Sequence, residues 1–327
     1  MGYHRLRIEE REEISRLLVV GVSVRGISRL VKRAASTISR EIQRSDRGQY
    51  RAVRADRQAW RNARRRRLGK RKIGSNQELE EMVFQKLMLR WSPQQIAQWL
   101  RETYSSSAMH LSAESIYTYV YILPRGALKR ELIKTLRHGH RKRRKQGRSR
   151  AGRPCNLEGM LSIEERPAEV VERIVPGHWE GDMLIGGRQA QSALGTLVER
   201  TTRTVLLVPL KNKTAKEVRQ AFAREMRRLP KQMRLSLTYD QGREMAEHKL
   251  FTKQTKIKVY FAHPRSPWER GTNENTNGLI RQFFPKGTNF RNISRKEIKR
   301  VQHLLNERPR KTLNWKTPYE TMNQLLQ

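Results

Sequence analysis

The sequence predicts a chain of several domains, in which an all-helical amino-terminal region precedes an α/β domain with a mixed sheet. Three observations predict this class. The 327 residues exceed what one hydrophobic core usually holds. Apolar residues recur at helical spacing before residue 136, whereas blocks typical of strands begin after residue 166. Between them, residues 137–153 carry nine Lys or Arg, three glycines and no acid, so residues 137–165 are interpreted as a basic linker.

The first segment, residues 1–60, carries three short helical patterns between positions 8 and 44. In the second pattern Ile27, Leu30 and Val31 are expected to face inward. Two short helices joined tightly, the last presenting small polar and arginine side chains, suit a helix-turn-helix that enters a DNA major groove. A small helical bundle with a solvated face is the alternative. The outward-facing residues assigned to DNA contact are Ser36, Thr37, Ser39, Arg40 and Arg44.

The next segment, residues 61–136, combines a basic block with a second helix-turn-helix-like pattern. Eight of residues 61–72 are Lys or Arg, which indicates a solvated or phosphate-tracking stretch rather than a reader of base sequence. Downstream, Ser92 is placed to cap a helix whose first position is Pro93. A further helix follows with Ile116 facing inward. A second helical domain is therefore expected here.

The charge of the chain is strongly positive, with 70 Lys and Arg against 31 Asp and Glu and a formal net charge of +39. This excess favours a polyanion partner, and double-stranded DNA is the first candidate. No apolar run approaches the ~20 residues that span a bilayer, and the stretch MGYHRLRIEEREE lacks the apolar core of a signal peptide. The single cysteine, Cys155, excludes an internal disulfide. We expect a cytoplasmic, nucleoid-associated protein with no membrane partner and no small-molecule cofactor.

The last segment, residues 166–327, is expected to form one domain of strands and helices. Strand candidates are HWEGDMLIGG, a hairpin turning between Glu199 and Arg203, LSLTYD and KVYFAHP. Helical patterns cover residues 214–229 and 268–284. This order of elements indicates a mixed sheet flanked by helices.

Three acids in this domain are positioned to converge. Asp182 lies on the first strand, Asp240 ends the LSLTYD strand, and Glu274 lies on the later helix with 33 residues between it and Asp240. Carboxylates from two strands and a helix can hold a pair of divalent metals about 3.5–4 Å apart. Oxygen ligands and a phosphate substrate favour Mg²⁺ or Mn²⁺.

Each acid also has a simpler interpretation. Glu180 points to the same strand face as Asp182, because the side-chain period of a strand is two. Asp240 precedes a turn and is of the type that forms turns. Glu274 is placed to pair with Arg270 or Arg281 on an exposed helix, which contributes a few tenths of a kcal/mol.

The helix around Glu274 favours the metal interpretation. Gly271, Glu274, Gly278 and Arg281 share one ridge at helical spacing, with Asn277 beside it. Glycine inside a helix costs roughly 1 kcal/mol relative to alanine, which makes sense where a backbone of protein or DNA approaches closely. Arg281 would then point at a phosphate.

These motifs resemble a known family. The stretches HWEGDMLIGG, TYDQGREMAEH and SPWERGTNENTNGLIRQFFPKGT are similar to the catalytic region of the insertion-sequence-thirty (IS-thirty) family of bacterial DDE transposases, and the amino-terminal EEREEISRLLVVGVSVRGISR resembles that family's DNA-binding module. Gln241 stands where many relatives have Asn, and Met245 where an aromatic is common. Both departures affect only the region after Asp240.

The resemblance implies an RNase H-like fold of the retroviral-integrase type, in which Asp182, Asp240 and Glu274 are the catalytic triad and hold two divalent ions. It implies recognition of terminal inverted repeats, followed by strand cleavage and strand transfer into target DNA, within a homo-oligomer that holds both ends. Residues assigned to DNA contact in this half are Arg270, Asn277, Arg281 and Lys286.

We therefore predict a transposase. A DNA-binding regulator with a catalytically silent second half is one alternative. A nuclease that cuts without joining is another, because it would share the triad.

Overall fold

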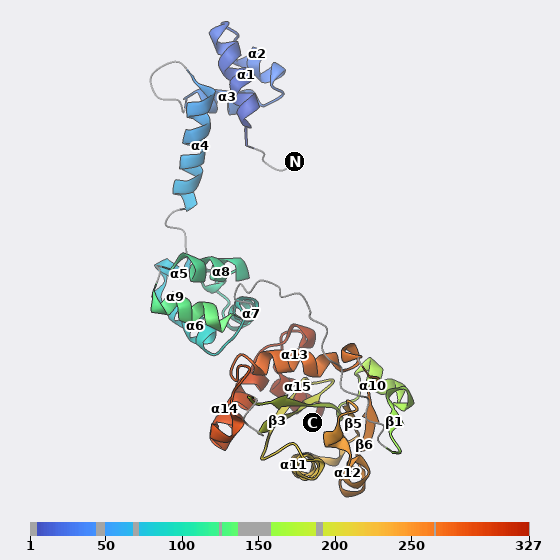
Figure 1. Ribbon diagram of the computed structural model, residues 1–327. Coiled ribbons are helices and arrows are strands. Elements are labelled where there is room, and N and C mark those ends of the chain that lie inside the picture. The colour runs from blue at the N-terminus through green and yellow to red at the C-terminus, as the bar shows by residue number, and fades with distance from the viewer. Residues whose placement is uncertain are drawn as a thin grey trace. The chain divides into compact units, whose positions relative to one another are not determined.

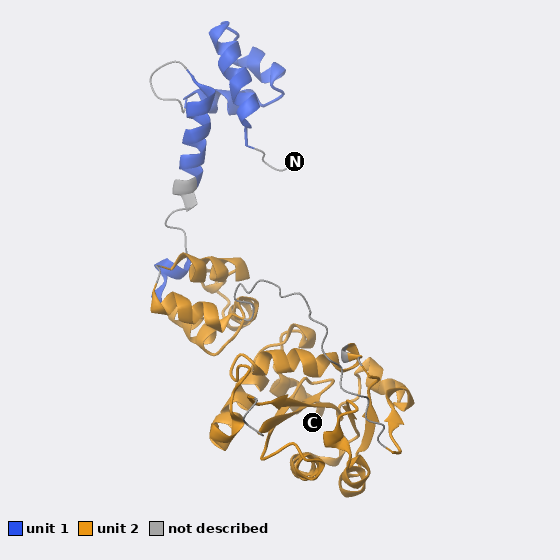
Figure 2. Ribbon diagram, viewed as in Figure 1, with its two compact units in different colours: residues 1–77 blue, residues 78–327 orange. Residues whose placement is uncertain are grey.

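The computed structural model describes residues 5–43, 50–67, 72–123, 126–136, 158–187, 192–264 and 266–326. The chain divides into two compact units, residues 1–77 and residues 78–327 (Figure 2). Each unit is described by itself. Arg44 and most of the expected linker lie outside the described residues.

The first unit is helical, as the apolar spacing predicts (Figure 1). Its helices are α1 (Ile8–Val19), α2 (Val24–Leu30), α3 (Ala35–Gln43), α4 (Ala52–Arg67) and α5 (Lys72–Ser75). The fully buried side chains of Ile14, Ile27 and Ile38 hold the first three helices together. The inward placement of Leu30 was wrong, because Leu30 ends α2 and is 62% exposed.

A buried arginine fixes how the helices of this unit pack. Arg11 on α1 donates to Glu41 on α3 at 2.6 Å and to Asp56 on α4 at 2.8 Å. A buried charge that is paired and hydrogen-bonded in this way is costly to remove from one side only. The network therefore specifies the angle at which α3 is presented.

The second unit begins with another helical module. Its helices are α6 (Gln77–Met88), α7 (Pro93–Thr103), α8 (Ala113–Ile122) and α9 (Ala127–Thr135). Ser92 caps α7 through a capping box with Gln95, and Pro93 takes the first helical position, as predicted. Ile116 and Val120 are fully buried on α8. The sequence did not indicate α9.

The rest of the second unit is built on one six-stranded sheet of order β1-β6-β5-β2-β3-β4. The strands are β1 (Leu161–Ser162), β2 (His178–Ile185), β3 (Ala193–Glu199), β4 (Val205–Leu210), β5 (Ser236–Tyr239) and β6 (Lys258–Phe261). β2, β3 and β4 form an antiparallel meander, whereas β5 and β6 add to β2 in parallel. The mixed sheet is confirmed, and this topology is RNase H-like. β1 pairs with β6 at residues that the sequence left in the linker.

Helices cover both faces of this sheet (Figure 1). They are α10 (Ala168–Glu172), α11 (Ala215–Arg227), α12 (His248–Thr255), α13 (Gly271–Ile280), α14 (Arg295–Asn306) and α15 (Pro318–Leu326). One core packs Trp179 and Leu237 against α11 and α12, and the other packs Leu194 and Val198 against α13 and α14. No helix in the described ranges is long and apolar enough to cross a membrane.

Candidate active site

The parallel pairing of β2 and β5 brings Asp182 and Asp240 together. Glu180 is the partner of Thr238 in this register. Two residues further along each strand, Asp182 therefore comes opposite Asp240, on the same face of the sheet as Glu180. Both acids are partly enclosed by the protein, with the side chain of Asp182 26% exposed and that of Asp240 41% exposed.

Arg270 lies between these two aspartates. It is the last residue of a 3₁₀ turn, Pro267–Arg270, that leads into α13. Its Nη2 donates to Asp240 Oδ2 at 3.1 Å, and its Nη1 lies 3.7 Å from Asp182 Oδ1. Nη1 also donates to the Gly181 carbonyl at 3.1 Å. The sequence assigned Arg270 to DNA, but the structure pairs it with the acids.

Helix α13 runs along β2 and contacts it through a series of polar side chains. Asn277 Nδ2 donates to Asp182 Oδ2 at 2.7 Å, and Arg281 Nη2 donates to the Ile185 carbonyl at 3.2 Å. Glu274 lies four residues after Arg270 and three before Asn277, so it shares their ridge. Its side chain is exposed. In the described part of the chain no three His, Cys, Asp or Glu side chains are grouped to hold a metal ion.

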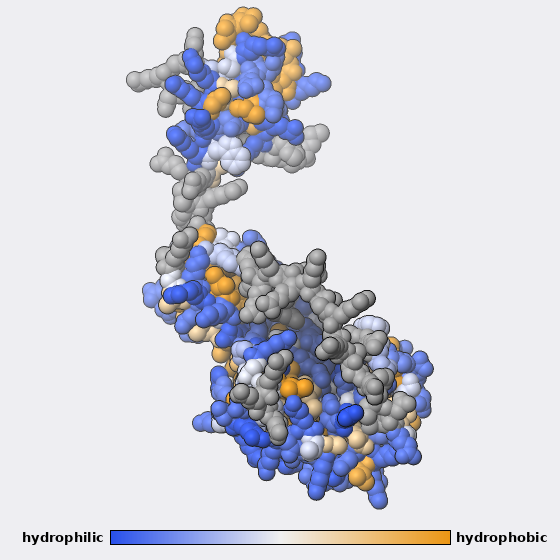
Figure 3. Space-filling view, viewed as in Figure 1, coloured by the Kyte–Doolittle hydropathy of each residue, from blue (hydrophilic) through white to orange (hydrophobic). Residues whose placement is uncertain are grey.

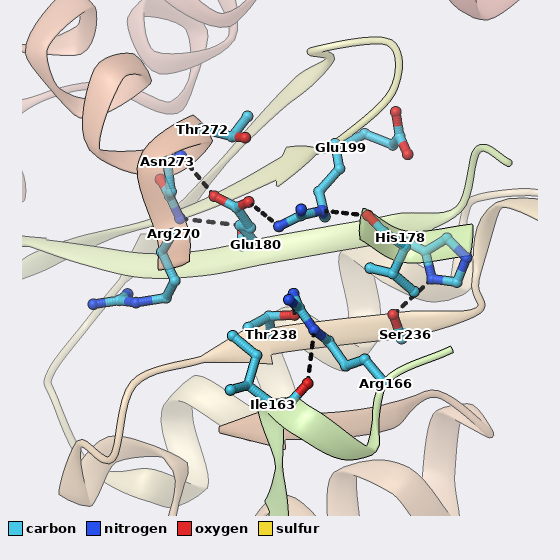
Figure 4. Close-up of polar contacts among 12 residues, drawn as sticks. Ile163, Arg166, His178, Glu180, Glu199, Ser236, Thr238, Arg270, Thr272 and Asn273 are labelled. Atoms are coloured by element: carbon cyan, nitrogen blue, oxygen red, sulfur yellow. Dashed lines mark hydrogen bonds and ion pairs between the residues drawn. The ribbon is translucent and has the colours of Figure 1, made fainter. Parts of the chain in front are cut away.

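Glu180, the other acid on this face of β2, has a structural role. It is fully buried and accepts hydrogen bonds from the backbone of Asn273 at 2.9 Å and from Arg200. Figure 4 shows this cluster between α13 and β2, with Arg270 extending away from it. Because both carboxylate oxygens of Glu180 are used within the protein, Asp182 is the acid of this strand that remains available to a ligand.

Glu269, the acid next to Arg270, is used within the protein. It accepts from the backbone and the ring of His263, each at 2.8 Å. The interpretation of Gly271 as a residue inside a helix was wrong, because Gly271 is the first residue of α13. A Cβ at this position would have open space around it, with no neighbouring described atom within 4 Å. The close approach expected at Gly271 therefore does not come from the described part of this chain.

Burial and negative charge set the electrostatics of the site. Burial raises the pKa of Asp182 above its usual value, and Arg270 partly offsets this effect. Burial likewise raises the pKa of Glu244, with Asp240 and Asp182 adding to the effect. Glu244, which lies in the turn after Asp240, could not be recognised from the sequence pattern. Its only signal was one more acid beside the LSLTYD strand.

Two buried oxygen atoms at this site have unused acceptor capacity. Asp240 Oδ1 and Asn277 Oδ1 have no hydrogen-bond partner among the described residues. Buried polar atoms nearly always have a hydrogen-bond partner. Two buried oxygens without one therefore mark a place where a donor or a cation fits. Carboxylate and amide oxygens are the ligands that Mg²⁺ and Mn²⁺ accept. The donor set therefore fits a hard divalent cation.

The residues assigned to DNA contact lie on two separate surfaces. On α3 of the first unit, Ser36 and Arg40 are exposed, whereas Thr37 and Ser39 are half-buried. In the second unit Lys286 is exposed beyond the end of α13. These five side chains keep at least part of their surface open to a ligand.

Two family models match this architecture. An integrase core domain matches residues 172–267, which contain Asp182 and Asp240. A helix-turn-helix domain matches residues 2–45, which contain α1, α2 and α3. Both descriptions agree with the elements seen in the two units.

Several known proteins are similar to this chain. A transposase for insertion sequence element IS1086 from Cupriavidus metallidurans is 43% identical, covering 99% of this chain and 96% of that protein. Transposase InsI for element IS30A from Escherichia coli K12 is 42% identical over 96% of this chain and 82% of its own length. A solved HTLV-2 integrase catalytic core domain in complex with magnesium, in a trimeric form, covers 45% of this chain and 97% of that domain at 22% identity and a TM-score of 0.36. The chain matches these two transposases at 43% and 42% identity over nearly its whole length, and it has a helix-turn-helix domain and an integrase core. It therefore belongs to the IS30 (IS-thirty) family of insertion-sequence transposases.

Proposed function

We propose that Asp182, Asp240 and Glu274 are the acids with which this transposase cuts and joins DNA. One observation carries the assignment. Asp182 and Asp240 lie opposite each other on neighbouring parallel strands and share one arginine. The helix that supplies this site with Asn277 carries Glu274 one turn away on the same ridge.

The three acids, together with Asn277 Oδ1, would hold two divalent ions, Mg²⁺ or Mn²⁺. The unpaired buried oxygens of Asp240 and Asn277 support this. When bound, such a pair of ions activates the attacking oxygen and stabilises the leaving oxygen of a phosphodiester. The protein's own part is to hold Asp182 in one orientation, through Asn277 and the backbone amide of Met183 at 2.8 Å.

The reaction would proceed in two displacements at phosphorus. Water attacks the phosphodiester at the end of the element, the bond between phosphorus and O3′ breaks, and a 3′-hydroxyl is released. That hydroxyl then attacks a target phosphodiester, forms a new P–O3′ bond and displaces the target's own 3′ oxygen. The first step hydrolyses one phosphodiester to a 5′-phosphate and a 3′-hydroxyl, the second exchanges one phosphodiester for another, and neither needs a covalent link between protein and DNA.

DNA contact would be divided between the two units. The exposed face of α3, with Ser36 and Arg40, would read the terminal inverted repeats in the major groove. Arg281 and Lys286 would contact phosphates near the acids. Two copies of the chain or more would hold both ends and the target, and these substrates would place the protein on the bacterial nucleoid.

The assignment is tested with purified protein, inverted-repeat DNA and Mg²⁺. Asp182→Asn, Asp240→Asn and Glu274→Gln should each abolish cleavage and joining while leaving DNA binding intact. Glu297→Gln is the matched control for Glu274, because Glu297 is a helix glutamate that pairs with Arg300 on the surface of α14. This control should retain both reactions. Strand transfer by Glu274→Gln at the wild-type rate would remove Glu274 from the triad, and cut but unjoined ends would make the protein a nuclease.

A further inference from the structure

Arg270 bridges the acid pair in the manner of a small cation. One guanidinium nitrogen faces each carboxylate, with Nη2 at 3.1 Å from Asp240 and Nη1 at 3.7 Å from Asp182, and the side chain is 13% exposed. Bidentate pairing with a single carboxylate is the stronger arrangement for arginine. Here the guanidinium instead divides its charge between two acids.

The turn that carries Arg270 is held in place on both sides. Glu269, the preceding residue, is bonded to His263, and Arg270 itself donates to the Gly181 carbonyl at 3.1 Å. The contact with Asp182, at 3.7 Å, is an ion pair beyond hydrogen-bonding range. The fold therefore directs Arg270 toward both acids, but its contact with Asp182 is the weaker of the two.

The site keeps attraction for a further cation while Arg270 is there. Two carboxylates against one guanidinium leave a net negative charge, and Glu244 lies close enough to it that both aspartates contribute to raising the pKa of Glu244. Asp240 Oδ1 and Asn277 Oδ1 are left without partners among the described residues. An incoming ion thus meets acceptors that the guanidinium does not use.

We infer that Arg270 is the resident counter-cation of the acid pair, and that a divalent ion must displace its guanidinium from between Asp182 and Asp240. The inference rests on the proposed function, which makes these aspartates metal ligands. In metal-free protein Arg270 offsets the repulsion between the two carboxylates. When an ion arrives, the same positive charge opposes it, so Arg270 lowers the affinity of the site for its first ion.

The test measures Mn²⁺ binding to the full-length protein by calorimetry, without DNA. Arg270→Gln should bind the first Mn²⁺ about tenfold more tightly than wild type, which corresponds to about 1.4 kcal/mol. Its Tm without metal should be lower than that of wild type, and Mn²⁺ should raise it by more. Arg270→Lys, which keeps the charge but loses the fork, should have an intermediate affinity. Arg281→Gln removes a charge on the same ridge that donates only to backbone carbonyls, so its Mn²⁺ affinity should equal that of wild type.

The outcomes separate this inference from the function on which it rests. Asp182→Asn and Asp240→Asn should lose Mn²⁺ binding, and wild-type binding by both would overturn the metal site together with the inference. If both lose binding while Arg270→Gln and Arg270→Lys bind no more tightly than wild type, the metal site stands and displacement of Arg270 is refuted. Displacement of Arg270 is also refuted if Arg281→Gln increases Mn²⁺ affinity as much as Arg270→Gln does, because removing any positive charge near the site would then have the same effect. Should Arg270→Gln fail to fold, Arg270→Lys decides the question.

Discussion

Asn277 uses the two ends of its amide differently. Its Nδ2 donates to Asp182 at 2.7 Å, whereas its Oδ1 is buried without a partner among the described residues. A side chain that orients a metal ligand typically contributes 10–100-fold to activity or metal affinity. Its neighbour Asn273 has a different task, since its side-chain Nδ2 donates to the backbone carbonyl of Glu180 at 3.1 Å.

We predict that Asn277→Ala lowers the rate of strand cleavage about 10–100-fold with little change in DNA affinity. Asn273→Ala should instead lower the free energy of unfolding by about 1–3 kcal/mol, because the Glu180 carbonyl loses the donor Nδ2 and the Thr196 hydroxyl loses the acceptor Oδ1 in the protein interior. Cleavage assays and chemical denaturation of both variants check this. A fall in DNA affinity as large as the fall in rate would show that Asn277 contacts DNA, as the sequence suggested.

His178 makes the stability of the second unit depend on pH. Burial lowers its pKa below the usual 6.5, Glu169 opposes this shift, and Ser236 Oγ lies 2.7 Å from Nδ1. Between the lowered pKa and 6.5 the unfolded chain therefore binds a proton that the folded chain does not. The stability contribution is complete above pH 6.5 and is lost as pH falls through the folded pKa.

We expect the urea midpoint of the wild-type protein to fall between pH 7.5 and pH 5.5 by more than that of His178→Gln, which cannot titrate. The difference between the two proteins isolates this histidine from other groups. An equal fall in urea midpoint for the two proteins would mean that His178 is protonated in the folded protein at the same pH as in the unfolded chain.

At the scale of the elements, glycine allows strands to lie against large rings. A Cβ on Gly195 of β3 would collide with the ring of Phe222 on α11, and a Cβ on Gly181 of β2 would lie 2.6 Å from the ring of Tyr239. Tyr239 precedes Asp240, so the packing at Gly181 also helps to place an acid. Overpacking of this kind typically costs about 1–3 kcal/mol.

Gly195→Ala should therefore lower the free energy of unfolding by about 1–3 kcal/mol. Gly271→Ala is the matched control. It lies in helical conformation with open space at its Cβ, so it should be neutral or stabilising by up to about 1 kcal/mol. Chemical denaturation measures both, and a destabilised Gly271→Ala together with an unaffected Gly195→Ala would contradict the packing argument.

Sequence pattern predicted the elements that have clear periodicity and clear ends. The strands at β2 to β6, the helix α11 and the capped start of α7 are where the sequence placed them. It missed α12, between β5 and β6, because eight residues with mixed polarity give a weak pattern. It also missed β1, whose two residues are defined only by their partner β6.

For the site, sequence supplied the acids but not their contacts. Asp182, Asp240 and Glu274 could be proposed together because they lie on two strands and a glycine-containing helix and because their motifs resemble those of a known family. The pairing of Arg270 with two of them could not be named, because it depends on the register of β2 with β5 and on the turn before α13. Charge pattern alone predicted that an arginine here would serve DNA.

At the scale of the whole molecule, the helix proposed to read DNA and the acids proposed to act in catalysis lie in separate units of the chain. Helix α3 lies in residues 1–77, and the three acids lie in residues 78–327 (Figure 2). Hydrophilic residues cover much of the visible surface of both units (Figure 3), and Lys and Arg outnumber Asp and Glu by 70 to 31 in the chain. On the proposed function, phosphate contacts from both units would contribute to affinity, and α3 would supply the base readout.

We predict that a chain of residues 78–327 loses the footprint on inverted-repeat DNA but retains salt-sensitive, non-specific binding and divalent-ion binding. Its plot of log affinity against log salt should be shallower than that of the full chain, because fewer phosphates are contacted. Arg40→Ala in the full chain is the control. It should weaken the footprint by about 1–3 kcal/mol while keeping nearly the full salt slope. A footprint that survives in the shortened chain would assign base reading to the second helical module.

The two asparagines of α13 show how closely helix and strand must match in length. Asn273 and Asn277 are four residues apart on the helix, which is a rise of about 6.0 Å. Their partners Glu180 and Asp182 are two residues apart on β2, which is about 6.6 Å. The two spacings agree well enough for both bonds to form together. Natural or engineered insertions are thus tolerable in the loops that separate these motifs, but one residue added inside either motif breaks the match and moves an acid out of the site.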